Sequence, residues 1–281
     1  MIGIVTVNWN AYKMTLNFID QVLLSDLQEF RLVIVNNSPQ ENTLFDLDET
    51  IRDPRIEIIH TGENVGYSGG LNRGIQWLIR DPGVDHLLLT NNDVEFDKAF
   101  LRQLTTAGAK ADSIYAPVIL YQDTDLIQST GGRVIKGLGT AMNLNKNVPI
   151  EKVRVIEPDF LTGCMLYMSR RVVEKVGLFD QRYGSYWEDV DYSYRAKREG
   201  IRLEVLWGLT AHHFHSYSSK GYPELKTFLL NRNQIIFAMK HLSPAPRTLF
   251  IIAAILRGFV ESLLKGQVIA FFRGIRDGFK C

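Results

Sequence analysis

Short apolar runs alternate with longer amphipathic stretches through the first third of the chain. The runs are short enough to be strands that are buried on both faces of a sheet. Four of them lie at residues 2–7, 32–35, 56–59 and 87–89. Apolar residues at helical spacing follow the first run over 14–23 and the third run over 68–79. This alternation indicates an α/β protein with βαβ units and a mostly parallel sheet.

The second half of the chain is less regular but continues the alternation. Further strands are expected at residues 114–121, 127–135, 160–168 and 203–207. Helices are expected over 170–176 and from residue 186 to a C-cap at Gly200. A mobile connection is indicated by Gly131, Gly132, Gly137 and Gly139. Because no internal repeat or low-complexity linker occurs, we expect one main domain with a C-terminal appendage.

Composition narrows the class of protein. Apolar content of 46% and charged content of 22% are typical of a globular protein, and the net charge of +1 excludes a globally basic nucleic-acid binder. Two cysteines, Cys164 and Cys281, offer no disulfide framework, which suits a reducing compartment. The N-terminus is interpreted as a first strand and not a signal peptide. No run reaches the roughly 18 apolar residues of a membrane span, so a soluble or peripheral protein is expected.

Polar side chains follow three of the first four predicted strands. They are Asn8 and Asn10, then Asn36 and Asn37, then Asn91, Asn92 and Asp93. The carboxyl ends of parallel strands are where α/β proteins collect ligands, so these side chains should line one crevice. A carboxylate among amides suits Mg²⁺ or Mn²⁺ shared with a diphosphate. The alternative for Asn-Asn-Asp alone is a simple turn.

Several nucleotide-binding motifs are absent. The turn after the first strand is Asn8-Trp9-Asn10, where a dinucleotide fingerprint would need Gly-x-Gly-x-x-Gly. No Walker A or Gly-x-Ser-x-Gly pattern occurs either. A nicotinamide enzyme is therefore not expected.

Eight segments, taken together, carry a family resemblance. They are VTVNWN at 5–10, VIVNNS at 33–38, NVGYSGGLNRGI at 64–75, LLLTNNDV at 87–94, LTGCMLYMSRRVVEKVGLFD at 161–180, YWEDVDYSYRAKREG at 186–200, HFHSYS at 213–218 and LLNRNQIIF at 229–237. In order and spacing the chain resembles family 2 glycosyltransferases of the GT-A fold, and among them the bacterial rhamnosyltransferase-like group. The resemblance implies one Rossmann-like, mostly parallel sheet flanked by helices. It also implies a catalytic domain over 1–240, with a nucleotide-sugar half at about 1–110 and an acceptor half at about 111–240.

The resemblance assigns roles to particular residues. The donor-binding set is Asn8, Asn10, Asn36, Asn37, Asn64, Gly66, Gly70, Asn72, Asn91 and Asn92, and the acceptor-binding set is Gly163, Cys164 and Trp187. Asp93 and His213 are the expected metal ligands, with His212 and His215 as rivals for the histidine. The alternative for the histidines is a surface loop.

Asp189 resembles the family's general base, and Glu188 is expected to help hold the acceptor or the loop. A helix N-terminus favours the ionised carboxylate that a base requires. The alternative is that these are ordinary first-turn acids without chemistry.

The resemblance implies an inverting transferase that acts by direct displacement. The expected donor is dTDP-L-rhamnose, or another nucleotide hexose such as UDP-galactose, and the acceptor is a hydroxyl of a growing cell-surface polysaccharide or lipid-linked glycan. The expected cofactor is Mg²⁺ or Mn²⁺. A catalytically silent sugar-nucleotide-binding protein is the alternative, since Asn91 stands where the family's metal motif often has Asp. A nucleotidyltransferase would need a glycine-rich first loop with Lys or Arg, which is missing.

Residues 241–281 carry an amphipathic, basic pattern. Apolar residues recur at helical spacing over 249–263 and again over 268–279, flanked by Arg257, Lys265, Arg273, Arg276 and Lys280. Helices of this kind bind anionic membrane surfaces, so peripheral contact through 249–280 at the cytoplasmic face of the inner membrane is expected. Packing onto the catalytic domain or onto a twin subunit in a homo-oligomer is the alternative.

Overall fold

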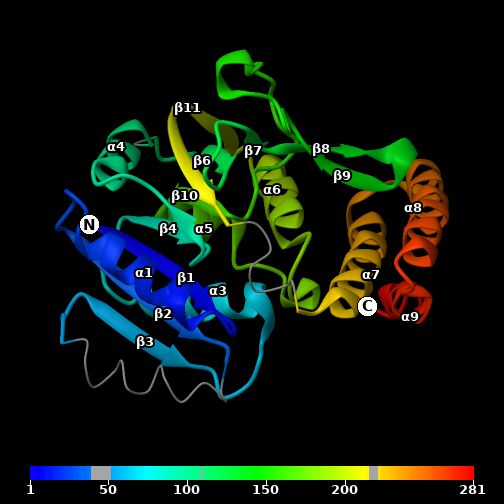
Figure 1. The fold of residues 1–281 in the computed structure, drawn as a ribbon, viewed down its shortest axis with the longest axis horizontal. Coiled ribbons are helices and arrows are strands. Elements are labelled where there is room, and N and C mark those ends of the chain that lie inside the picture. The colour runs from blue at the N-terminus through cyan, green and yellow to red at the C-terminus, as the bar shows by residue number, and fades with distance from the viewer. Residues whose placement is uncertain (39–51, 109, 215–220) are drawn as a thin grey trace.

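The structure is a computed structural model that describes residues 1–38, 52–108, 110–214 and 221–281 (Figure 1). Its strands are β1 (Ile2–Asn8), β2 (Phe30–Asn36), β3 (Ile56–His60), β4 (His86–Thr90), β5 (Val94–Glu95), β6 (Ser113–Tyr121), β7 (Ile127–Ser129), β8 (Gly132–Ile135), β9 (Thr140–Asn143), β10 (Met165–Ser169) and β11 (Arg202–His213). Its α-helices are α1 (Tyr12–Leu23), α3 (Gly66–Leu78), α4 (Phe100–Ala107), α5 (Arg170–Val176), α6 (Glu188–Arg198), α7 (Pro223–His241), α8 (Pro244–Leu264) and α9 (Val268–Gly278). Short 3₁₀ turns are η1 (Lys136–Leu138), η2 (Ile150–Lys152) and η3 (Gln181–Tyr183).

One twisted sheet organises the described residues in the order β3-β2-β1-β4-β10-β6-β11-β5, with β7 on β6. Strands β3, β2, β1 and β4 run parallel, and β11 runs parallel to β6. Only β10, β5 and β7 are antiparallel to their neighbours. The register places Asn8 beside Asn36, so the polar ends of the first two strands meet at one edge. The predicted mostly parallel α/β fold is confirmed.

Helices cover both faces of the sheet. On one face, Phe18, Ile19 and Val22 of α1 and Phe100, Leu101 and Leu104 of α4 pack onto the strands. On the other face the packing comes from α3, α5 and α6. Each central strand therefore buries both of its faces, which explains the uninterrupted apolar runs.

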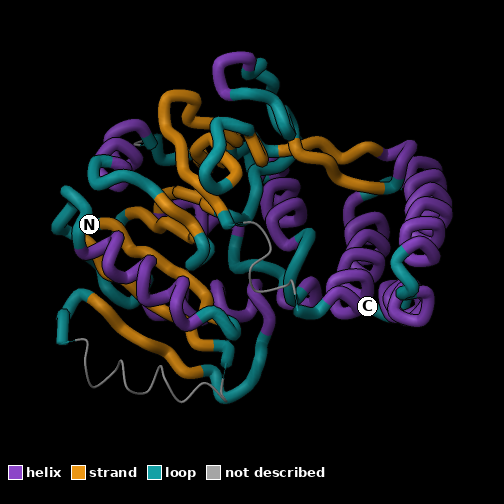
Figure 2. The backbone as a smooth tube through the Cα atoms, viewed as in Figure 1, coloured by secondary structure: helices purple, strands orange, loops and turns teal. Residues whose placement is uncertain are grey.

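A third cluster joins the C-terminal helices to the rest of the molecule. Trp187 and Val190 pack with Phe237 of α7 and with Phe250 and Ala254 of α8. Figure 2 shows these helices beside the β8–β9 hairpin, far from the N-terminus. The two predicted tail helices are present as α8 and α9. Within the described residues, no helix is both long and apolar enough to cross a membrane.

Three sequence predictions about local structure need correction. The strand expected at 160–168 begins only at Met165, because the amides of Leu161 and Gly163 bond to side chains of α6 and not to a strand. The strand expected at 127–135 is divided into β7 and β8 at Gly131, whose φ is +81°. The glycine-rich connection is not a free loop: at Gly139 a Cβ would lie 2.2 Å from the backbone nitrogen of Ala254, so the hairpin tip is seated on α8.

Candidate active site

The predicted metal pair forms at the end of β4. Strand β5 pairs with β11 so that Val94 lies opposite His213, which places Asp93 beside the histidine. Oδ1 of Asp93 lies 3.1 Å from Nε2 of His213, and Nδ2 of Asn91 lies 3.1 Å from the same nitrogen. The Asp93 and His213 side chains are 7% and 10% exposed.

Gln128 orients the His213 ring through the ring nitrogen Nδ1. Oε1 of Gln128 lies 2.7 Å from Nδ1, which leaves Nε2 turned toward Asp93. Burial alone would lower the pKa of His213, but charge and hydrogen bonding from Cys164 and Asp93 raise the pKa well above its ordinary value. His212 points to the opposite face, because successive strand residues alternate. His215 lies outside the described residues.

Asp93 and His213 fit a divalent cation as a minimal donor set. Two ligand atoms about 3 Å apart can share one ion, and Mg²⁺ sites commonly use one or two protein ligands plus substrate phosphates and water. Among the described residues, no group of three or more His, Cys, Asp or Glu side chains gathers to hold a metal. A nucleotide diphosphate would therefore have to complete the coordination.

Asp189 and Glu188 open α6, as predicted. Oδ2 of Asp189 accepts a hydrogen bond of 2.8 Å from the Gly163 amide, and Oδ1 accepts one of 2.8 Å from Val190. Burial raises the pKa of Asp189 although these amides oppose the effect. Burial and the nearby Asp189 raise the pKa of Glu188 well above its usual range. Among the described residues nothing hydrogen-bonds Oε2 of Glu188, which is buried.

Tyr67, which sequence reasoning did not select, is bonded on the Asp189 side of the site. Its hydroxyl donates a 3.1 Å hydrogen bond to the Gly163 carbonyl, whose own amide holds Asp189. Burial raises the pKa of Tyr67 well above its ordinary value, and nearby Glu188, Cys164, Asp93 and Asp189 raise it further. Tyr67 therefore lies near both the base and Asp93 of the metal pair. Its only signal in the sequence is its place among the glycines that open α3.

Three of the predicted donor-binding asparagines, Asn8, Asn36 and Asn92, belong to one hydrogen-bonded group that includes Thr15. Nδ2 of Asn8 donates to Oδ1 of Asn36 at 3.1 Å, while Oδ1 of Asn8 accepts from the Thr15 hydroxyl at 2.9 Å. Asn92 donates to the same Thr15 hydroxyl at 2.7 Å. These asparagines are 0–5% exposed, so they form a buried hydrogen-bonded group at the ends of β1, β2 and β4. Thr15 was not predicted, because only its position on α1 brings it there.

Residues 64–70, which comprise the end of the loop before α3 and the first turn of α3, adjoin Asn37 just after the end of β2. Asn37 donates to the Gly66 carbonyl at 2.9 Å, and Asn64 accepts from the Gly66 amide at 2.9 Å. Gly66 has φ +75°, and a Cβ there would lie 2.8 Å from the Gly184 backbone. At Gly70 a Cβ would lie 2.9 Å from Val7, so this glycine lets α3 approach β1.

Three other predicted residues, Asn72, Asn10 and Trp187, do not join the groups described above. Asn72 is 1% exposed and exchanges two hydrogen bonds with the Phe179 backbone, so it offers no surface to a ligand. Asn10 is exposed and donates to the Tyr222 hydroxyl at 3.1 Å. Of the predicted acceptor residues, Gly163 and Cys164 adjoin Asp189 and His213, whereas Trp187 is 5% exposed and packs into the third cluster.

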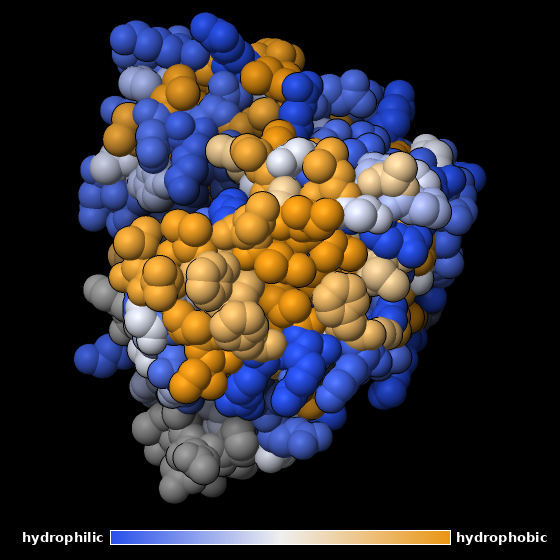
Figure 3. All heavy atoms as spheres, turned by 90° about the vertical axis from the view of Figure 1, so that its right-hand side faces the viewer, coloured by the Kyte–Doolittle hydropathy of each residue, from blue (hydrophilic) through white to orange (hydrophobic). Residues whose placement is uncertain are grey.

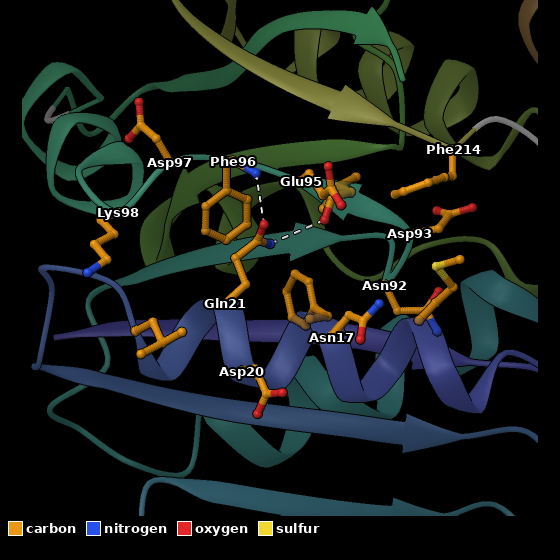
Figure 4. A pocket seen from close by; sticks show the side chains of 14 residues that line it. Asn17, Asp20, Gln21, Asn92, Asp93, Glu95, Phe96, Asp97, Lys98 and Phe214 are labelled. Atoms are coloured by element: carbon orange, nitrogen blue, oxygen red, sulfur yellow. Dashed lines mark hydrogen bonds between the residues drawn. The ribbon is translucent and has the colours of Figure 1, made fainter. Parts of the chain in front are cut away.

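A groove of about 570 Å³ runs between α1 and the segment 92–98 (Figure 4). Gln21 spans it, accepting from the Phe96 amide at 2.9 Å and donating to the Val94 carbonyl at 3.2 Å. Asn92 and Asp93 lie at one end, but Asp189 does not line it. The groove therefore reaches Asp93 of the metal pair but not the predicted base.

Two solved glycosyltransferase structures share the fold of this chain. A mannosyltransferase from Pyrobaculum calidifontis, in complex with GDP-Man and Mn²⁺, matches 97% of this chain and 73% of its own, with a TM-score of 0.61 and 12% identity. S. aureus TarS 1-349 in complex with UDP-GlcNAc matches 99% of this chain and 80% of its own, with a TM-score of 0.61 and 13% identity. These likenesses confirm the predicted GT-A fold.

The family follows from the sequence. Residues 3–177 match the family model of glycosyl transferase family 2, and the chain belongs to that family. The low-salt glycan biosynthesis hexosyltransferase Agl10 of Haloferax volcanii is 27% identical over 206 residues, which cover 72% of this chain and 63% of the relative. The N-acetylglucosaminyl-diphospho-decaprenol L-rhamnosyltransferase of Mycobacterium tuberculosis is 28% identical over 170 residues, 53% of this chain and 55% of the relative. The chain thus spans less than two thirds of the length of these relatives.

Proposed function

We propose that the protein is an inverting glycosyltransferase that moves L-rhamnose from dTDP-L-rhamnose onto a hydroxyl of a lipid-linked glycan or growing cell-surface polysaccharide. The observation that carries the proposal is Asp189, a half-buried carboxylate held by the Gly163 amide at the sheet edge where Asp93 and His213 meet. Family membership and the rhamnosyltransferase relative support the sugar and the lipid-linked acceptor. The hexosyltransferase relative keeps UDP-galactose as the alternative donor.

The residues suit a direct displacement. Asp189 would accept the proton of the acceptor hydroxyl as the hydroxyl attacks the anomeric carbon, and its raised pKa makes it a stronger base than an exposed aspartate. The neighbouring Glu188 favours its neutral form, because two carboxylates that close together do not readily ionise at once. Gly163 would then position the acceptor side of the site through Asp189 and Tyr67.

Asp93 and His213 would hold the Mg²⁺ or Mn²⁺ ion. When bound, the ion would neutralise the charge of the departing nucleoside diphosphate. The Mn²⁺ in the mannosyltransferase neighbour supports this assignment. The donor would occupy residues 1–110 and the acceptor residues 111–240.

The test is transfer from dTDP-L-rhamnose, or from UDP-galactose, to N-acetylglucosaminyl-diphospho-decaprenol. Asp189→Asn should lower the rate by about 10²- to 10⁴-fold, the range for loss of a general base. The matched control is Asp26→Asn, at an exposed carboxylate that pairs with Arg102. Donor binding, measured as a thermal shift, should survive in Asp189→Asn. In the wild type this binding should require Mg²⁺ or Mn²⁺, and replacing His213 should remove the effect of the metal. Full rate in Asp189→Asn would refute the base, and binding without transfer in the wild type would favour the silent binding protein.

We also propose that α8 and α9 rest on an anionic membrane surface, with the protein at the cytoplasmic face of the inner membrane. Their outer face is a broad apolar area (Figure 3), and its exposed members are Leu249, Ile252, Leu256, Phe259, Val260, Leu263, Leu264, Ile269, Phe272 and Phe279. Contiguous apolar areas rimmed by charge mark interaction surfaces. Lys265, Arg273 and Lys280 supply cations beside it, each worth about 1 kcal/mol near an anionic surface.

Full-length protein should co-sediment with vesicles of phosphatidylglycerol. A triple variant, Leu256→Gln, Leu264→Gln and Ile269→Gln, should not, because these side chains are 64%, 83% and 79% exposed. The control, Leu24→Gln with Val155→Gln, alters equally exposed apolar residues elsewhere. Truncation at residue 244 is a poor test, because Phe250 is fully buried in the core. Unchanged sedimentation of the triple variant would contradict the proposal, and a changed oligomeric state would identify the area as a subunit interface.

A further inference from the structure

The loop that leads into α6 has an unusual backbone. Tyr186 and Trp187 have φ of 68° and 72°, and Gly184 has φ of 65°. Left-handed conformations are uncommon for residues with a side chain, and two bulky ones in succession need support from their surroundings. Glu188 and Asp189 follow directly, so the shape of this loop sets where both carboxylates point.

Asn233 of α7 binds three carbonyls of this loop. Its Nδ2 donates to Tyr183, Ser185 and Tyr186 at 2.8, 2.8 and 2.7 Å. Its Oδ1 accepts from Nε of Arg232 at 2.9 Å, which fixes the orientation of the amide. The side chain is fully buried.

The opposite side of the loop is held by the start of α3. Both the amide and the hydroxyl of Ser68 donate to the Gly184 carbonyl, at 2.8 and 3.1 Å. The Tyr67 amide donates to Oγ of Ser185 at 3.3 Å. Every carbonyl from 183 to 186 is therefore bonded, partly by α3 beside the donor crevice and partly by α7.

We infer that Asn233 is a positioning residue, which holds the loop 183–187 in its left-handed conformation and thereby aims Asp189 at the acceptor hydroxyl. Asparagine suits the task chemically: aspartate has no N–H to donate, and serine has one donor for three carbonyls. The inference rests on the proposed function only in treating Asp189 as the base.

The chain offers a matched control in Asn231, two residues away on α7. It is also buried, but its Nδ2 donates to the Thr227 carbonyl of its own helix at 2.8 Å. Asn233→Ala and Asn231→Ala thus remove the same atoms from the same helix. Two readouts are compared: amide hydrogen exchange over residues 184–190, and kcat and KM for transfer from dTDP-L-rhamnose.

Asn233→Ala should speed exchange in the loop and lower kcat by about 100-fold, the scale of a misplaced catalytic group, with KM for the donor little changed. Asn231→Ala should leave both near wild type. Asn233→Ser, which keeps one donor, should be intermediate and serves if Asn233→Ala does not fold. Equal effects of the two alanine variants, or unchanged loop exchange in Asn233→Ala, would overturn the inference. If the wild type transfers no sugar, the proposed function fails while the exchange comparison still decides the role of Asn233.

Discussion

Two acidic groups near the start of α6 differ in their partners. Asp191 is fully buried and accepts hydrogen bonds from Arg195, Lys240 and His241 at 2.8, 2.7 and 2.7 Å. Burial alone would raise its pKa, but these donors lower the pKa to about 2. Glu188 and Asp189 are three and two residues earlier in the chain. Among the described residues they have no such charged donors as partners, and burial raises the pKa of both.

The comparison shows that the helix N-terminus does not decide the charge of a carboxylate here. All three acids lie in the first turn of α6. The counter-charges come from α7 and from the far end of α6, and they reach only Asp191. Counter-charges thus stabilise the ionised form of Asp191, whereas the proposed catalytic carboxyls of Glu188 and Asp189 have none among the described residues. Functional sites commonly lower the stability of a protein in this way.

Asp191→Asn should have the largest effect on stability. It would leave Arg195, Lys240 and His241 around a neutral group, and breaking a buried ion pair typically costs about 3–5 kcal/mol. The free energy of unfolding, measured with urea at pH 7, should fall by that amount. Asp26→Asn is the control, because Asp26 and its partner Arg102 are 43% and 63% exposed, and losing this surface pair should cost at most about 1 kcal/mol. Equal losses of unfolding free energy in the two variants would contradict the special role of the charged partners of Asp191.

Glu188→Gln should act in the opposite direction and raise the free energy of unfolding at pH 7 by about 0.5–2 kcal/mol. Since the pKa of Glu188 is raised on folding, the native state binds the proton more tightly than the unfolded state. Its contribution is favourable below the unfolded pKa and is lost as pH rises through the folded pKa. The gain of the variant should therefore vanish in unfolding measured near pH 4. A loss of stability at pH 7 would contradict this assignment.

The smallest expected effect is on the pH dependence of transfer. The base must be ionised, so kcat/KM should fall at low pH along a limb that lies above the ordinary aspartate pKa. In Glu188→Gln the limb should stay in place, because burial sets the raised pKa of Asp189 and Glu188 is the neutral member of the pair when Asp189 ionises. Asp180→Asn should also leave the limb in place. A limb that moves to lower pH in Glu188→Gln alone would show that Glu188 is ionised in the active enzyme and would contradict the neutral form assigned to it.

Sequence alone determined the fold class and the edge of the sheet where the polar strand ends lie together. Apolar period and strand length follow from local burial, so β1, β2, β3 and β4 were predictable. Since parallel strands end on the same side, the polar residues after them had to meet. Asp93 and Asp189 could be selected because a family resemblance supplied their roles, which residue pattern alone left open.

The tertiary structure decided which partners these side chains have. Asn8 bonds to Asn36 and to Thr15, and His213 is oriented by Gln128, 85 positions away in the chain. Asn233 reaches a loop about 50 residues earlier. A local pattern records whether a residue is buried and at what period, whereas a hydrogen-bond partner depends on how distant elements pack. For that reason Tyr67 and Asn233, each placed within a matching segment, became recognisable only once α3, α6 and α7 were assembled around one loop.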